Sequence, residues 1–132
     1  MTNVKMTGYL PHDKTVSLLQ HAKATIYPSL LYEGGFPLTI IESFSVSTPV
    51  IVSNSPNISS NIKEGYNGFL FETGSASSLL AMIKEFNNLV KDSIAEQELK
   101  KNARRCYEES YTEEVVYHRM LEIYQAAVKN NR

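Results

Sequence analysis

Residues 24–53 read ATIYPSLLYEGGFPLTIIESFSVSTPVIVS, and this stretch decides the fold. Residues 24–27 and 49–53 are short, apolar and rich in β-branched side chains, a composition typical of buried strands. Between them, Pro37 suits the first turn of a helix, which we expect over residues 38–46. Two strands joined by one helix through short connections predict neighbouring parallel strands.

The rest of the chain extends this alternation in both directions. Residues 4–10 and 69–71 are two further strand candidates. Helices are expected over the remaining segments: residues 14–22 with Asp13 as cap, a short helix from Ser59 or Ser60 to Gly65, and an all-helical last third with helices after Ser75, over 94–109 and from Thr112 onward. We therefore expect an α/β fold: a partial Rossmann-like parallel sheet of about four strands, with flanking helices and a helical C-terminal tail.

The composition limits the function classes. The chain has 132 residues, enough for one buried core, and its 13 basic and 14 acidic residues give a formal net charge of −1. Without a basic excess to hold a phosphate backbone, we expect no nucleic-acid partner. The apolar runs span only a few residues and the first residues form no signal-peptide core, so we expect no membrane span and a cytoplasmic location.

Cysteine and histidine are too few and too scattered to indicate a metal. Cys106 is the single cysteine, which excludes a disulfide within the chain. The three histidines, His12, His21 and His118, lie far apart without a second ligand at helical spacing. We expect no metal site and no cofactor.

The loop before the helix at residues 38–46 has the residue types of a phosphate site. Gly34 and Gly35 let the backbone turn tightly and approach a ligand, and the helix start presents unpaired amides and positive dipole. Glu33 precedes the glycines, and Glu42 lies about one turn into the helix. Because carboxylates accept hydrogen bonds from vicinal hydroxyls, a nucleotide sugar, with a diphosphate between two polyols, would match these features.

A purely structural explanation stays open for each of these residues taken singly. Paired glycines before a helix are common in loops, and both carboxylates can simply be solvated. The fuller Gly-x-Gly-x-x-Gly fingerprint of dinucleotide-binding loops is absent.

Several motifs in register resemble a known family. Their sequences are YPS, EGGFP, IESF, TPVI and GYNGFL, at residues 27–29, 33–37, 41–44, 48–51 and 65–70. They are similar to motifs in the C-terminal domain of the retaining, nucleotide-sugar-dependent glycosyltransferases of group 1, whose GT-B fold has two facing Rossmann-like domains. The resemblance covers residues 4–80, and it implies that residues 1–132 are part of the nucleotide-sugar-binding domain, with 75–132 mostly helical.

The resemblance also implies roles for individual residues. Glu42 is expected to accept hydrogen bonds from the ribose hydroxyls of the donor nucleotide. Glu33 is expected near the hydroxyls of the donor sugar, as the catalytic carboxylate. The remaining donor-binding residues form the loop whose amides face the diphosphate and the helix start beneath it: Gly34, Gly35, Phe36, Pro37, Leu38 and Thr39.

This sequence departs from the family pattern at several positions. The doubled glycine puts one extra residue between the two glutamates, which we expect to displace Glu33 rather than Glu42. Ser47 stands where the family has glycine, and Ser60 where it often has an acidic residue. The family's diphosphate-binding Arg and Lys are missing, and Lys14, Lys23 and Lys63 do not match their positions.

The family's N-terminal acceptor-binding domain and the first strands of its donor domain are missing as well. In the family's sheet those strands lie between the equivalents of residues 4–6 and 25–27. We therefore expect an exposed strand edge, which would be paired by self-association or by the rest of a longer protein.

Two functions from different classes remain. The first is the donor-binding portion of an enzyme of the hexosyltransferase type. Such an enzyme moves a sugar from a nucleotide diphosphate-sugar to an acceptor, with retention and without a metal. The acceptor stays unidentified, and a peripheral membrane acceptor is one of the alternatives. The second is a non-catalytic module that binds a nucleotide or a partner subunit. A receiver-like signalling domain is disfavoured because no cluster of Asp residues follows the strands.

Overall fold

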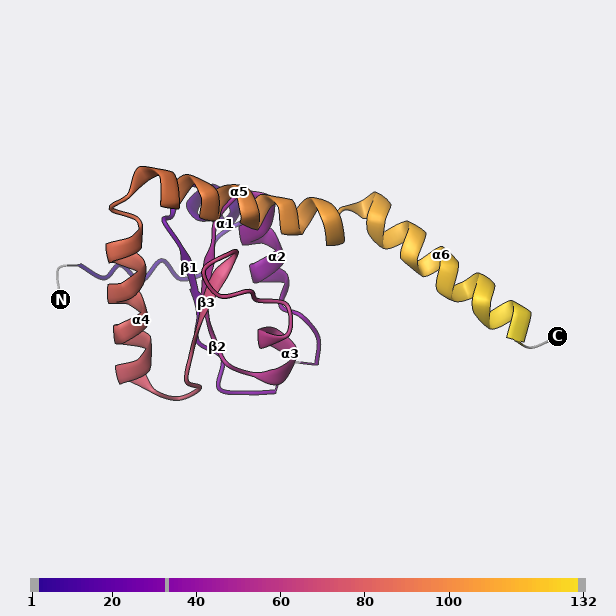
Figure 1. Cartoon of the computed structure of the whole chain (residues 1–132), viewed down its shortest axis with the longest axis horizontal. Helices are drawn as coiled ribbons and strands as arrows, with labels where there is room; N and C mark the ends of the chain where they lie inside the picture. Colours follow the sequence, from indigo (N-terminus) through magenta and orange to yellow (C-terminus); the bar gives the residue numbers. More distant parts are fainter. Residues whose placement is uncertain (1–2, 33, 131–132) are drawn as a thin grey trace.

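The computed structural model describes residues 3–32 and 34–130 and has an α/β fold around a parallel three-stranded sheet. The strands are β1 (Thr25–Tyr27), β2 (Val50–Ser53) and β3 (Gly68–Phe71), in the spatial order β1-β2-β3 (Figure 1). Ile26 of β1 aligns with Ile51 of β2. The predicted α/β class and its parallel strands are confirmed.

Six helices surround and extend this sheet in the described residues. They are α1 (His12–His21), α2 (Leu38–Ser45), α3 (Pro56–Ser59), α4 (Ala76–Leu89), α5 (Ser93–Ser110) and α6 (Glu113–Asn130). Helices α2 and α5 pack on each other beside the sheet (Figure 1). Helix α4 packs on β3, and its Phe86 shares a buried apolar cluster with Leu99 of α5. The last third of the described chain is helical, with Ser75 Oγ accepting the Ser78 amide at the start of α4.

The core is divided by β2, whose four residues are all buried. Val50 and Val52 pack with Ile40 and Phe44 of α2 on one face of the sheet. Ile51 points to the other face, where it belongs to a second apolar cluster with β3 and α4. Burial of each such side chain contributes about 1.5–3 kcal/mol, so the central strand holds helices on both faces.

The prediction of about four strands is wrong by one. Residues 4–10 form no strand, and three of their apolar side chains, Val4, Met6 and Tyr9, are exposed, Met6 at 90%. A strand is stable only when its backbone pairs with a neighbour, and among the described residues β1 pairs on one edge only, with β2. Residues 4–10 therefore have the composition of a strand, but no described strand pairs with them.

Two predicted helix starts also need correction. Helix α1 begins at His12 after Pro11, so Asp13 lies in its first turn and is not the cap. The short helix predicted from Ser59 or Ser60 to Gly65 lies earlier, at Pro56–Ser59, because proline is well suited to the first helical position.

Ser47, which replaces a glycine of the family pattern, lies directly after the end of α2 with a φ of 65°. This left-handed conformation favours glycine, because a Cβ there approaches the following carbonyl group. The replacement therefore stores backbone strain at the link between α2 and β2.

We predict that Gly68→Ala lowers the free energy of unfolding by about 2 kcal/mol or more, since a Cβ at Gly68 would lie 2.5 Å from the Val50 carbonyl oxygen. Gly35→Ala is the matched control, because no heavy atom lies within 4 Å of a Cβ placed there. Urea unfolding followed by circular dichroism measures both variants. Equal stability of the two would contradict the close approach of β2 and β3.

Candidate functional site

The glycine loop and the start of α2 lie beyond the carboxyl end of β1. Strand β1 ends at Tyr27 and α2 begins at Leu38, so the intervening loop leaves the sheet at the end where its parallel strands point. In open parallel sheets, ligands bind in crevices at this end. The fold therefore places the predicted donor-binding segment where such a site is expected.

The two glycines of the loop are exposed, with open space around them. Among the described residues, a Cβ built on Gly34 or Gly35 meets nothing within 4 Å, and Gly35 does not have the left-handed conformation that would demand glycine. The Gly35 carbonyl accepts a hydrogen bond from Asn57 Nδ2 at 3.5 Å, which ties the loop to α3. Packing does not require these glycines, so their small size is available for close approach of a ligand.

Phe36 and Pro37 anchor the loop to the body of the protein. The Phe36 ring stacks on Tyr111, just after α5, with 5.6 Å between centroids and 12° between planes. Pro37 is buried, and its carbonyl accepts the Ile40 amide at 3.1 Å. The sequence reasoning missed Tyr111, because nothing in its local pattern links it to a loop so far away in the chain.

The first turn of α2 is suited to an anion. Leu38 is 74% exposed and Thr39 is partly exposed. Within the described ranges, the amides of these two residues donate to no backbone acceptor. No acidic side chain lies in this turn, so the positive end of the helix dipole is not compensated there.

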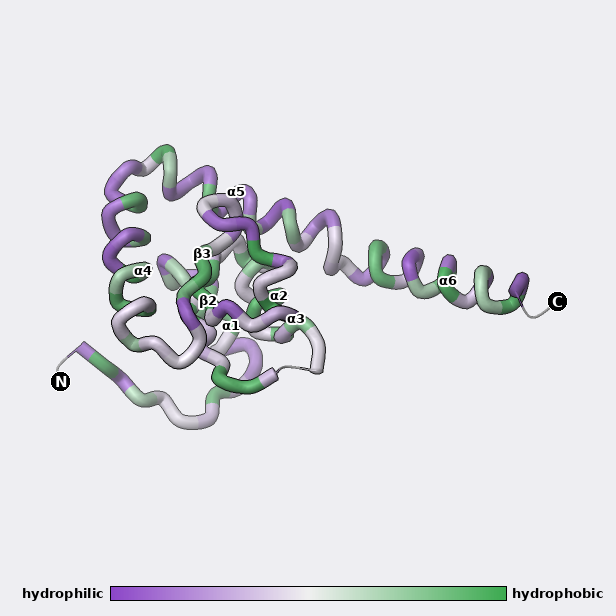
Figure 2. Tube along the Cα trace, turned by 60° about the horizontal axis from the view of Figure 1, so that its bottom comes forward, coloured by the Kyte–Doolittle hydropathy of each residue, from purple (hydrophilic) through white to green (hydrophobic). Residues whose placement is uncertain are grey.

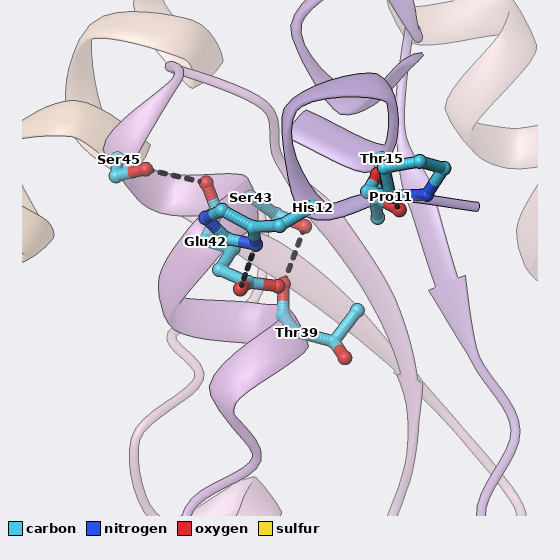
Figure 3. Close-up of polar contacts among 7 residues, drawn as sticks. All are labelled: Pro11, His12, Thr15, Thr39, Glu42, Ser43 and Ser45. Carbon is cyan, nitrogen blue, oxygen red and sulfur yellow. Dashed lines mark hydrogen bonds and ion pairs between the residues drawn. The ribbon is translucent and has the colours of Figure 1, made fainter. Parts of the chain in front are cut away.

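Glu42 lies one turn further along α2, and its side chain is 31% exposed. Its Oε1 lies 3.4 Å from Nδ1 of His12, the first residue of α1, as Figure 3 shows. The carboxylate thus lies between α2 and the start of α1. His12 is a second residue that the sequence reasoning missed, since thirty positions separate it from Glu42.

Ser43, next to Glu42, fixes α2 on the sheet. Its hydroxyl donates to the Thr39 carbonyl at 2.8 Å (Figure 3). The residue is fully buried, and the same hydroxyl lies 2.9 Å from Thr25 Oγ1 of β1. Because Ser43 points to the sheet, the preceding residue must point to the side of the helix where α1 begins. The orientation of Glu42 follows from this buried contact.

The structure brings most of the predicted donor-binding residues together on one loop and one helix, from Gly34 to Thr39 with Glu42. Glu33, the predicted catalytic carboxylate, lies outside the described residues. The basic side chain that reaches Glu42 is His12 and none of the three lysines considered from the sequence. One of those, Lys63, lies with Nζ 5.5 Å from the Tyr66 ring centroid.

Two cavities lie at the carboxyl ends of the strands, beside the loops that the sequence marked as ligand-binding. A cavity of about 450 Å³ is lined by Asn54 after β2 and by Glu72 and Ser78 beyond β3. A smaller one, about 260 Å³, lies between Leu30 of the glycine loop and Leu79 of α4. Open volume therefore borders the loop on the α4 side of the sheet.

Two further searches covered the described residues only. No three His, Cys, Asp or Glu side chains gather there in a group that could hold a metal ion. None of the helices there is both long and apolar enough to cross a bilayer.

The family profile described as Glycosyl transferases group 1 matches residues 1–106, and the chain belongs to this family. An N,N'-diacetylbacillosaminyl-diphospho-undecaprenol alpha-1,3-N-acetylgalactosaminyltransferase from Campylobacter jejuni is 29% identical over 115 residues. This match covers 87% of our chain and 29% of that relative. The chain thus spans less than a third of the length of this curated relative.

Solved structures show the same fold. A sucrose-phosphate synthase from Thermosynechococcus elongatus superposes with a TM-score of 0.81 at 23% identity, over 98% of our chain and 31% of that chain. Anabaena Alr3699/HepE, solved in complex with UDP, has a TM-score of 0.71 at 18% identity, over 83% of our chain and 29% of that chain. The Rossmann-like GT-B relationship expected from the sequence is confirmed.

The stacked Tyr111 gives a prediction for high pH. Burial is the largest cause that raises the pKa of its hydroxyl above the usual 10.0, and the nearby Cys106 raises this pKa further. Arg119 has the opposite effect and lowers it. The neutral phenol is therefore favoured in the folded state, and this stabilisation is present below pH 10 and lost as the pH rises through the folded-state pKa. As the pH rises from about 9 to about 11, we expect the free energy of unfolding to decrease less in Tyr111→Phe than in the wild type.

The control for this prediction is Tyr117→Phe, because Tyr117 is 61% exposed. It should follow the wild-type pH dependence in urea titrations. If Tyr111→Phe did so too, the stacked ring would not hold its phenol in the neutral form.

Proposed function

We propose that this chain is the donor-binding portion of a glycosyltransferase that moves a sugar from a nucleotide diphosphate to an acceptor with retention. The observation that carries the proposal is the relation of Glu42 to the first turn of α2. A half-buried carboxylate follows the unpaired amides by about 6 Å of helix axis, on the helix that begins beyond the carboxyl end of β1. This order matches the ribose and the diphosphate of one nucleotide.

Each group of the site has a task in this proposal. The Glu42 carboxylate accepts hydrogen bonds from the vicinal ribose hydroxyls, and His12, 3.4 Å away, holds that carboxylate in position. The amides of Leu38 and Thr39 face the diphosphate, which reaches them because Gly34 and Gly35 leave open space. Glu33 is proposed to act at the donor sugar.

The described site supplies little positive charge to compensate the negative charge of the diphosphate. A helix start provides only about half a unit of positive charge, whereas a nucleotide diphosphate is a strong anion when it departs. We propose that further cations and the acceptor site belong to a polypeptide portion equivalent to the rest of the Campylobacter relative, of which this chain matches 29%.

A non-catalytic module is the second candidate. It is favoured by the small share of the relatives' length that the chain matches and by the β1 edge, which pairs with β2 on one side only among the described residues. In this alternative, the site binds a nucleotide without transferring a sugar.

The first test is Glu42→Gln with UDP as the probe, chosen because the HepE neighbour was solved with UDP. Loss of a charge-assisted hydrogen bond costs about 1.5–3 kcal/mol, so we expect UDP affinity measured by calorimetry to fall at least about tenfold. Glu85→Gln, an exposed carboxylate on α4, is the control and should bind UDP like the wild type. GDP and ADP are titrated in parallel to identify the base.

Wild-type affinity in Glu42→Gln would overturn the assignment of the ribose site. Amide chemical shifts provide a second reading, because UDP should perturb the signals of Leu38 and Thr39 more than those of α4.

A second test separates the enzyme from the module. The isolated chain is mixed with a UDP-sugar, and release of UDP is followed over time. Because the described site lacks the cations that a departing diphosphate needs, we expect binding with no release above the buffer rate. Release that Glu42→Gln abolishes would show that the chain is catalytic by itself and would exclude the module.

A further inference from the structure

The imidazole of His12 connects two elements of the candidate site. Its Nδ1 lies 3.4 Å from Oε1 of Glu42, thirty positions further along the chain (Figure 3). The contacts of His21 and His118 are of another kind, because each of these residues has its partner one turn earlier in its own helix. Contacts of that kind follow from helix geometry alone, whereas the contact between His12 and Glu42 requires α1 and α2 to pack together.

Helix α1 is held in place by contacts among the described residues. It lies beside α2 in both views of the fold (Figures 1 and 2). The buried Thr48, two residues before β2, donates a hydrogen bond from its hydroxyl to the Leu19 carbonyl at 2.7 Å. At the other end of α1, the Pro11 carbonyl accepts the Thr15 amide at 3.0 Å. The backbone of His12, the first residue of this helix, is therefore fixed relative to α2.

The contact with Glu42 determines which ring nitrogen of His12 can accept a hydrogen bond. A carboxylate oxygen accepts and does not donate, so the Nδ1 atom that faces it carries the proton of the neutral ring. The other nitrogen, Nε2, is then an acceptor. It points away from the carboxylate, on a side chain that is 75% exposed.

Nε2 of His12 and the carboxylate of Glu42 together match a vicinal diol. The ribose of a nucleotide has two neighbouring hydroxyl groups, and each needs an acceptor when it is withdrawn from water. His12 contacts Oε1 of Glu42, which leaves Oε2 for one hydroxyl group and Nε2 of His12 for the other. A lysine or arginine at this position could neutralise Glu42, but neither side chain has an acceptor atom.

We propose that His12 binds the ribose of the donor nucleotide directly, with its Nε2 accepting a hydrogen bond from one vicinal hydroxyl group while Glu42 accepts from the other. This inference rests on the proposed function, and it divides between two residues the pair of hydroxyl groups assigned there to Glu42. His12 thereby helps to select a ribonucleotide over a deoxyribonucleotide, because loss of either hydroxyl group leaves one of the two acceptors unpaired.

Two variants at position 12 test the direct contact, with UDP binding to the whole chain measured by calorimetry. His12→Asn keeps an N–H group near the place of Nδ1 but has no atom at the place of Nε2, so we expect UDP to bind about three- to tenfold more weakly. His12→Gln carries an amide oxygen that can reach the place of Nε2 and accept there. It should therefore bind UDP more tightly than His12→Asn.

The choice of ligand separates a direct contact from a structural role. 2′-Deoxy-UDP and 3′-deoxy-UDP each lack one hydroxyl group of the diol. For one of these two ligands, His12→Asn and the wild type should have equal affinity, because the hydrogen bond that the variant removes is already absent. His21→Asn is the matched control, since His21 is exposed at the other end of α1, and it should bind all three ligands like the wild type.

Two results would overturn the direct contact and leave Glu42 as the ribose residue. They are wild-type affinity of His12→Asn for UDP, and equal weakening of all three ligands by this variant. Two other results would overturn the proposed function and this inference together: no binding of UDP by the wild type, and wild-type affinity of Glu42→Gln. Circular dichroism of each variant checks that the chain remains folded.

Discussion

The burial of β2 on both faces is the constraint on which the rest of the structure depends. Its side chains alternate between two apolar clusters, so helices must cover both sides of the sheet. The parallel direction of the strands then requires each connection to return along one face. As a consequence α2 starts beyond the carboxyl end of β1, where Leu38 of its first turn is exposed.

Within that frame, one buried hydroxyl decides how the site is oriented. Ser43 joins α2 to β1 through Thr25, and this contact turns Glu42 towards the start of α1. The glycine loop is anchored at its far end by Phe36 on Tyr111. The site therefore combines a rigid helix start with an open loop, which is the combination that anion recognition requires.

Two surfaces of the described chain are of different kinds. Strand β1 lies at one edge of the described sheet, and α6 has exposed apolar side chains. They differ in kind, because a strand edge selects another strand by hydrogen bonding, whereas an apolar helix face selects another apolar surface. The chain matches 29% of the length of the Campylobacter relative, so the described surfaces are those of a portion of that length.

By itself, the sequence determined the features that depend on neighbours along the chain. The alternation of strands and helices, the helix start after Pro37 and the place of Glu42 one turn into that helix all follow from local spacing. Tertiary structure alone decided that His12 faces Glu42, that Tyr111 supports Phe36, and that residues 4–10 form no strand. The physical reason is that a strand and a side-chain contact both need a partner distant in sequence, and a local pattern carries no information about which distant residue packing will bring there.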